Sequence, residues 1–135
     1  MKYQNVENNI NVVETYFKSI QTGDMETLGS LLSKDIIWHQ PGQNKFSGIH
    51  CGSEVVFAML SEMMEVSNGT FKISSVDTVM GNESKVATML SFSAEREGAS
   101  MSMKGVDICT VQNGQIVEAW LYSEDQNTED TFWGK

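Results

Sequence analysis

The sequence is poor in basic residues: nine Lys and Arg stand against eighteen Asp and Glu, which gives a net charge of −9. Nucleic acids and anionic membrane surfaces both require clustered positive charge, so we expect neither as a partner. Long apolar runs are missing too. No segment approaches the roughly 20 apolar residues of a membrane span, and the polar N-terminus lacks the apolar core of a signal peptide. These absences predict a soluble, cytoplasmic protein.

Cysteine and histidine are equally scarce. Cys51 and Cys109 lack the spacing of metal ligands or of a redox motif, so we expect two free, buried thiols, although a disulfide between them stays possible. His39 and His50 have no metal-binding spacing, and we expect neither a metal nor a cofactor. With 135 residues and 40% hydrophobic content, the chain is long enough to form a single domain over residues 1–135.

The first half of the chain has a helical hydrophobic period. Apolar residues three or four positions apart predict a helix over 6–20 that ends at Gly23. Asp24 has the position and chemistry of an N-cap for a second, shorter helix. A third helix is expected from Ser53, with the Ser53 hydroxyl as its cap and Phe57 on its apolar face.

From residue 70 the hydrophobic period changes to 2, which is typical of strands. An earlier apolar run, DIIWHQ at 35–40, predicts a further strand that stops at Pro41, the only proline in the sequence. Helices followed by successive antiparallel strands indicate the α+β class. The four later strands are expected at 70–80, 84–97, 100–111 and 115–125.

The last two predicted strands carry bulky apolar residues on both faces. Ile108 alternates with Cys109, and Trp120 and Tyr122 alternate with Leu121 and its neighbours. A sheet that is buried on one side should be polar on the other, and three helices cannot cover both faces. We therefore expect a homodimer through the outer face, formed by Ile108, Trp120 and Tyr122.

Several short motifs occur in an order that resembles the nuclear transport factor 2-like superfamily, in particular its SnoaL-like (polyketide cyclase) and ketosteroid isomerase-like branches. The motifs are WHQPG at 38–42, FSG at 46–48, GVD at 105–107, NGQIVEAW at 113–120 and EDQ at 124–126. The resemblance implies a strongly curved antiparallel sheet wrapped around the N-terminal helices. Such a cone encloses a ligand pocket, and dimers through the outer face are common in the superfamily.

The resemblance also implies a set of site residues. Ketosteroid isomerase combines a carboxylate base with a tyrosine and a protonated aspartic acid, which together hold an oxyanion in an apolar cavity. The tyrosine corresponds to Tyr16 and the aspartic acid to Asp107, while the base corresponds to the position before Pro41, which is Gln40. Glutamine cannot take up a proton at ordinary pH, so isomerisation by that mechanism is not expected here.

Asp107 has an argument of its own. It lies in the middle of a predicted strand, and its face is otherwise small and apolar, so desolvation would raise its pKa and make it a hydrogen-bond donor. The alternative is that Asp107 pairs with Lys104 or with a backbone amide. Tyr16, on the core face of a long helix, is either a ligand contact or a packing residue.

Asp125 is the candidate acid or base. SnoaL-like cyclases use an aspartate near the end of the last strand, and Asp125 is the best match to it. The period of the strand places Asp125 on the same face as Leu121 and Ser123, with Glu124 as the alternative if the register slips. The other interpretation is a solvated strand end in an acidic patch.

His39 faces away from Gln40 in a regular strand, so it is either a hydrogen-bonded structural residue or, with a bulge near Pro41, a second candidate base. Trp38 and the methionines are either pocket wall or core. The residues expected to bind the ligand are Trp38, Gln40, Phe57, Met103, Cys109, Ala119, Leu121 and Ser123.

Three functions remain open at this point. The first is a cofactor-independent isomerase or cyclase that acts on a small, mostly apolar carbonyl compound, with Asp125 or His39 moving the proton. The second is a non-catalytic domain that binds such a ligand, and the third is a structural dimer with a filled cone. Epoxide hydrolysis would also need an arginine, and the only one, Arg96, lies in a charged segment.

Overall fold

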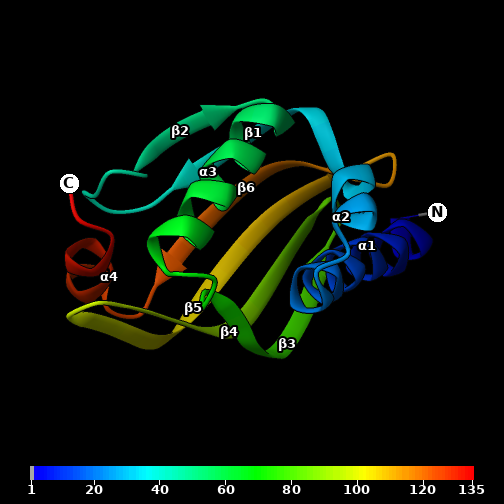
Figure 1. Ribbon diagram of the computed structural model, residues 1–135. Coiled ribbons are helices and arrows are strands. Elements are labelled where there is room, and N and C mark those ends of the chain that lie inside the picture. The colour runs from blue at the N-terminus through cyan, green and yellow to red at the C-terminus, as the bar shows by residue number, and fades with distance from the viewer. Residues whose placement is uncertain (1) are drawn as a thin grey trace.

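A curved sheet of six strands forms the centre of the molecule (Figure 1). The computed structural model describes residues 2–135, and side chains from residue 5 onward. The strand order is β2–β1–β6–β5–β4–β3, and all neighbours pair antiparallel except β1 and β6, which are parallel. The strands are β1 (Leu32–Gln40), β2 (Gly48–Cys51), β3 (Lys72–Asn82), β4 (Lys85–Arg96), β5 (Ala99–Gln112) and β6 (Gln115–Ser123).

The first three helices lie on one side of this sheet, and the last helix lies beside one end of it (Figure 1). The helices are α1 (Lys2–Thr22), α2 (Met25–Leu31), α3 (Ser53–Val66) and α4 (Gln126–Trp133). Helix α1 packs mainly on β3, α3 on β1, and α4 on β5 and β6. The predicted α+β class and the curved sheet around the N-terminal helices are confirmed.

Three local features differ from the sequence prediction. Strand β2 lies between the predicted strand at 35–40 and the predicted helix from Ser53, where no element was predicted, and α4 begins directly after residue 125, beyond the predicted end of the last strand. The N-cap of α3 is Gly52, with φ of 97°, and no side chain caps the helix, so the prediction of Ser53 as the cap is wrong. A positive φ favours glycine, which explains why the chain turns there rather than at a serine.

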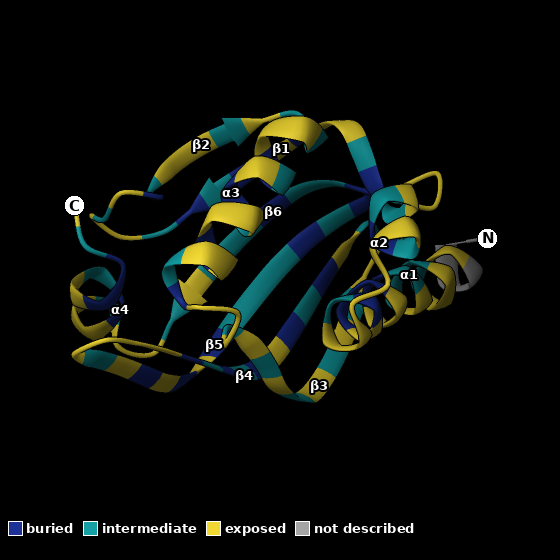
Figure 2. Ribbon diagram, viewed as in Figure 1, coloured by how far each residue is buried: buried dark blue, intermediate teal, exposed yellow. Residues whose placement is uncertain are grey.

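The core lies between the helices and the concave face of the sheet. Figure 2 shows bands of buried residues along the strands that α1 and α3 cover. Val13 and Phe17 of α1 and Val56 of α3 are fully or almost fully buried. Burial of such side chains stabilises a fold by about 1.5–3 kcal/mol each. On the sheet the inward residues alternate along β4 and β5, as a period of 2 requires.

The opposite face of the sheet is only partly covered. Tyr122 is 60% exposed, and Trp120 stacks on His39 with ring centroids 5.2 Å apart. Lys85 Nζ lies 4.7 Å from the Trp120 ring centroid, a cation–π contact. The chain therefore covers part of Trp120 with its own polar residues.

Both cysteines are free, but only Cys109 is buried, so the prediction of two buried thiols is wrong for exposed Cys51. Within residues 2–135, no helix combines the length and the apolar character needed to span a membrane.

Candidate functional site

A cavity of about 70 Å³ lies between the helices and the concave face of the sheet. Its wall is mostly apolar, with a few polar side chains, and pockets for drug-sized ligands are several times larger, about 300–1,000 Å³. A small compound is therefore the matching ligand. The polar side chains in the wall belong to Tyr16, Gln40, Asp107, Ser123 and Glu129.

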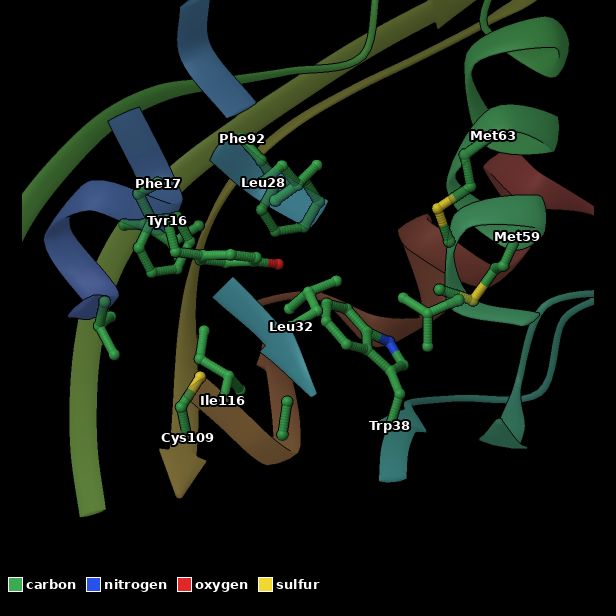
Figure 3. Close-up of a cluster of buried hydrophobic side chains, with 14 of the residues drawn as sticks. Tyr16, Phe17, Leu28, Leu32, Trp38, Met59, Met63, Phe92, Cys109 and Ile116 are labelled. Carbon is green, nitrogen blue, oxygen red and sulfur yellow. The ribbon is translucent and has the colours of Figure 1, made fainter. Parts of the chain in front are cut away.

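Tyr16 reaches into the interior from α1, and Figure 3 shows its hydroxyl directed away from the helix toward the side of the core where Trp38 lies. Its ring packs edge-on against Phe17, with centroids 4.9 Å apart. No side chain or backbone group within the described part of the chain hydrogen-bonds to the hydroxyl. Burial, with smaller contributions from nearby Cys109 and Asp107, raises the pKa of Tyr16 well above its ordinary value. The hydroxyl is thus a protonated donor at the cavity.

Asp107 lies in the middle of β5 and is half-buried, with its accessible surface facing the cavity. Neither Lys104 nor a backbone amide of the described chain pairs with its carboxyl group, so both of those alternatives are wrong. Desolvation, and then the negative charge of Glu129, raises the pKa of Asp107 to about 7. The shift brings this pKa into the neutral range, where the protonated carboxyl group can donate a hydrogen bond.

Thr88 of β4 lies directly opposite Asp107 in the antiparallel register. Its side chain is fully buried, and among the described residues Thr88 Oγ1 is the only side-chain oxygen or nitrogen that is completely enclosed and has no hydrogen-bond partner. Directly opposite pairs share a face of the sheet, so Thr88, Asp107 and Leu121 form one row across three strands. This row places two polar side chains, those of Thr88 and Asp107, side by side on the concave face.

Gln40 ends β1 and is 7% exposed. Its carbonyl Oε1 accepts a hydrogen bond of 2.9 Å from Trp38 Nε1. That bond fixes the orientation of the side-chain amide and leaves its NH₂ group without a partner among the described residues. Gln40 therefore adds a second fixed donor to the wall, where a carboxylate base was implied by the family resemblance.

Glu129 is a site residue that the sequence analysis missed. It projects from α4 and is 5% exposed. Ser123 Oγ donates to Glu129 Oε1 at 2.6 Å, Gln126 Nε2 donates to the same oxygen at 3.1 Å, and Trp133 Nε1 donates to Oε2 at 3.2 Å. A signal was present in the sequence: Glu129, Phe132 and Trp133 have helical spacing, so a helix that buries the two aromatics also buries the glutamate.

The placement expected for Asp125 is wrong. Strand β6 ends at Ser123, and Asp125 is the N-cap of α4, outside the cavity. Its carboxylate accepts hydrogen bonds from Thr128 N at 3.1 Å and Thr128 Oγ1 at 2.7 Å. These bonds, first the side-chain one and then the backbone one, lower the pKa of Asp125, which is the opposite of what a general acid at neutral pH needs. Glu124 also lies outside, where it accepts from Lys104 N at 2.9 Å.

His39 also lies away from the cavity, on the outer face. Its Nε2 is 2.7 Å from Glu118 Oε2, and its ring stacks on Trp120 with an interplanar angle of 5°. The expectation of a catalytic His39 therefore has no geometric support, because no bulge turns it inward. The hydrogen-bonded structural interpretation describes its position.

The structure brings six of the twelve predicted site residues to the cavity wall: Tyr16, Trp38, Gln40, Asp107, Leu121 and Ser123. Met103, Cys109 and Ala119 are buried in the adjoining core and not in the wall. Burial raises the pKa of Cys109, which leaves it an inert thiol. Phe57 is half-buried and lies beside Gly29 of α2. In the described part of the chain, no three His, Cys, Asp or Glu side chains gather as a metal site.

Comparison with known families and structures gives a consistent result. The model of the SnoaL-like domain family matches residues 13–119. A Xanthomonas campestris protein of unknown function with a cystatin-like fold is 50% identical, with a TM-score of 0.91 over 94% of this chain and 98% of that one. No curated protein matches the sequence.

Two further solved structures are similar. Bal32a, from a soil-derived mobile gene cassette, is 27% identical, with a TM-score of 0.90 over 96% of this chain and 98% of that one. An LEH-like epoxide hydrolase from M. tuberculosis is 16% identical, with a TM-score of 0.70 over 95% of this chain and 92% of that one. At 16% identity, the similarity to the epoxide hydrolase concerns the fold alone.

Proposed function

This chain belongs to the SnoaL-like domain family, and we propose that it is a cofactor-independent enzyme of the isomerase or cyclase type. Its substrate would be a small, mostly apolar compound with one carbonyl group, held in the cavity. The observation that carries the proposal is Asp107, a carboxyl group with no hydrogen-bond partner among the described residues, facing an apolar cavity with its pKa raised to about 7.

Three donors face the same small space. The Tyr16 hydroxyl and the Gln40 amide are free to donate, and the Asp107 carboxyl donates when it is protonated. A carbonyl oxygen that accepts from this group gains negative charge when a proton leaves the adjacent carbon, and the donors stabilise that charge more strongly than they stabilise the neutral carbonyl. A single well-placed donor of this kind contributes about 3–4 kcal/mol to transition-state stabilisation.

Binding of an enolate mimic tests this arrangement. Phenol carries its oxygen on a flat apolar ring, as an enolate does, so its affinity measured by NMR titration reports on the donors. We expect Tyr16→Phe and Asp107→Leu each to weaken binding at least about tenfold, which corresponds to the loss of one hydrogen bond to a charged or polarised oxygen. Asp77→Asn, on an exposed position of β3, is the control. Unchanged affinity in both variants contradicts the proposed oxyanion site.

A second candidate is a domain that binds the same ligand without turnover. The bond between Trp38 Nε1 and Gln40 Oε1 favours it, because the position before Pro41 is held as an amide that cannot take a proton. Such a domain would bind phenol with the same dependence on Tyr16 but would catalyse no isomerisation. Epoxide hydrolysis is disfavoured because Arg96 lies outside the cavity, where its Nη1 donates to the carbonyl oxygen of Phe132 at 3.0 Å.

We also propose that the partner of the outer sheet face is a second copy of this chain. Support comes from the exposed Tyr122, with Ile108 and Trp120 half-buried on the same face. Light scattering after size-exclusion chromatography should give twice the monomer mass of 15.0 kDa, and Tyr122→Lys should reduce it to the monomer. A monomeric wild type contradicts this assembly.

A further inference from the structure

We propose that Glu129, presented by α4, is the general base of this site and replaces the carboxylate that is missing at Gln40. The inference rests on the proposed function and adds the residue that removes the proton. Two observations of geometry carry it: Glu129 is a buried carboxylate in the cavity wall, and it is fixed there by neighbours from two elements.

The hydrogen bonds of Glu129 leave one acceptor position open. A carboxylate has about four lone-pair positions. Oε1 uses two, for Ser123 and Gln126, whereas Oε2 uses one, for Trp133. The remaining position is therefore on Oε2, and the proposal assigns this position to the ligand.

Helix α4 is held firmly, which a base needs because small displacements reduce proton transfer. Gln126 Nε2 donates to Asp130 Oδ1 at 2.9 Å, and Asn44 Nδ2, from the loop after β1, donates to the same oxygen at 2.8 Å. Gly42 in that loop packs so closely that a Cβ atom there would collide with the side-chain amide of Gln126. These contacts join the loop that follows Gln40 to the helix that carries Glu129.

The two carboxyl groups have environments that separate their roles. Asp107 has no donor among the described residues and lies on the apolar wall, where the neutral form is favoured, whereas three donors hold the two carboxylate oxygens of Glu129 in place. The surroundings therefore suit Asp107 to donate a hydrogen bond and Glu129 to accept a proton or hydrogen bond from the ligand. The family resemblance implied Asp107 as the protonated donor and Asp125 as the acid or base, whereas our proposal places the base four residues further along the chain, at Glu129.

The step balances without a co-reactant. Glu129 Oε2 takes a proton from the carbon next to the carbonyl, the C–H electron pair moves into the C–C bond, and the carbonyl oxygen becomes an enolate oxygen held by Tyr16, Gln40 and Asp107. Glu129 then returns the same proton to a different carbon of the conjugated system. The double bond has moved, and the enzyme has regained its starting protonation state.

Cyclopent-3-enone is a suitable probe, because it is a small apolar ring with one carbonyl and its isomerisation to cyclopent-2-enone gives an ultraviolet signal. We expect wild type to accelerate this isomerisation, Glu129→Gln to reduce the rate at least about 100-fold, and phenol affinity to be retained. Glu129→Asp keeps the charge but moves the carboxylate by one methylene, so it should also lose rate. Glu65→Gln, an exposed carboxylate on α3, is the matched control.

A carbon-13 titration of the Asp107 carboxyl group distinguishes two roles of Glu129: a base, or only a negative charge near Asp107. The pKa of Asp107 should fall in Glu129→Gln and be largely kept in Glu129→Asp, because only the first variant removes the negative charge. Loss of rate in both variants supports the base. A rate equal to that of wild type in Glu129→Gln overturns it, even if the Asp107 pKa moves. An inactive wild type that still binds phenol through Tyr16 overturns the base and leaves the binding function standing.

Discussion

Two pairs of carboxylates in this molecule have almost opposite surroundings. Asp24 and Asp125 begin α2 and α4 in the same D-x-x-T pattern, and each accepts bonds of 3.1 Å from a threonine N and 2.7 Å from the same threonine Oγ1. Asp107 and Glu129 face the cavity instead. Threonine hydrogen bonds lower the pKa of both capping residues, whereas burial raises the pKa of Asp107 to about 7.

The difference shows that position along an element does not decide which acid can take part in chemistry. Asp125 and Glu129 lie only four residues apart. Asp125 caps α4 in solvent, whereas Glu129, one turn further along the same helix, is buried. A carboxylate that is fully committed to a helix cap contributes to folding. A carboxyl group without a donor in an apolar wall is destabilising when it ionises, which is a feature of functional sites.

The largest expected effect is on the free energy of unfolding and comes from Asp107, one of the two carboxyl groups that face the cavity. The folded-state pKa of Asp107 lies above the unfolded value of 3.8, so between about pH 4 and pH 7 the native state holds a proton that the unfolded state has lost. The free energy of unfolding should therefore fall as pH rises through this range. Asp107→Asn should raise the free energy of unfolding at pH 8 by about 3 kcal/mol, with little change at pH 4.

Urea denaturation at several pH values checks this sign. Asp77→Asn, an exposed aspartate on β3, is the control and should leave the pH profile unchanged. If Asp107→Asn destabilises the protein at pH 8, then the ionised carboxylate has a partner in the fold and the interior site is misassigned.

A smaller effect is expected at Thr88, across the sheet from Asp107. Its buried Oγ1 has no hydrogen-bond partner in the described residues, so replacing it by a methyl group of similar shape removes an unsatisfied polar atom. Thr88→Val should stabilise the protein by about 1 kcal/mol in thermal or urea unfolding. Ser67→Ala should do the reverse, because the Ser67 hydroxyl donates to Met63 O at 2.9 Å and accepts from Phe71 N at 3.2 Å. Equal signs in the two variants would mean that Thr88 is satisfied by an interior group or water.

Much of the fold could be predicted from the sequence, because its signals are local. The period of the N-terminal helix, the Asp24 cap and the Asn113–Gly114 turn all depend on neighbouring residues, and both turn residues indeed have positive φ. Two features could not be predicted from the sequence: the parallel pairing of β1 with β6 and the short strand β2. Both depend on contacts between distant segments. The β6 register also shifts near Val117, where a strict period of 2 fails.

The site was predictable only where the strand period held. Leu121 and Ser123 follow the period and face the cavity, but extending it two residues further to Asp125 passes the end of β6. The D-x-x-T pattern that identified the Asp24 cap recurs at Asp125, so the local signal for a helix start was present. Nothing local, however, indicates that Glu129 bonds to Ser123 or that its charge acts on Asp107, because both depend on how α4 packs against β5 and β6.

The smallest expected effect is on the melting temperature and comes from the two helix caps, Asp24 and Asp125. These caps give the clearest contrast with the two carboxyl groups that face the cavity. Asp24→Ala and Asp125→Ala should each lower the melting temperature by about 2–3 °C, whereas Asp→Asn at either position keeps a good N-cap and should change little. Because hydrogen bonds depress both pKa values, the difference from wild type should be complete above about pH 4 and disappear as the pH falls through the folded-state values. Asp125→Asn should also isomerise cyclopent-3-enone at the wild-type rate. If it loses turnover while Asp24→Asn does not, Asp125 takes part in proton transfer, and the division between capping and catalytic carboxylates fails.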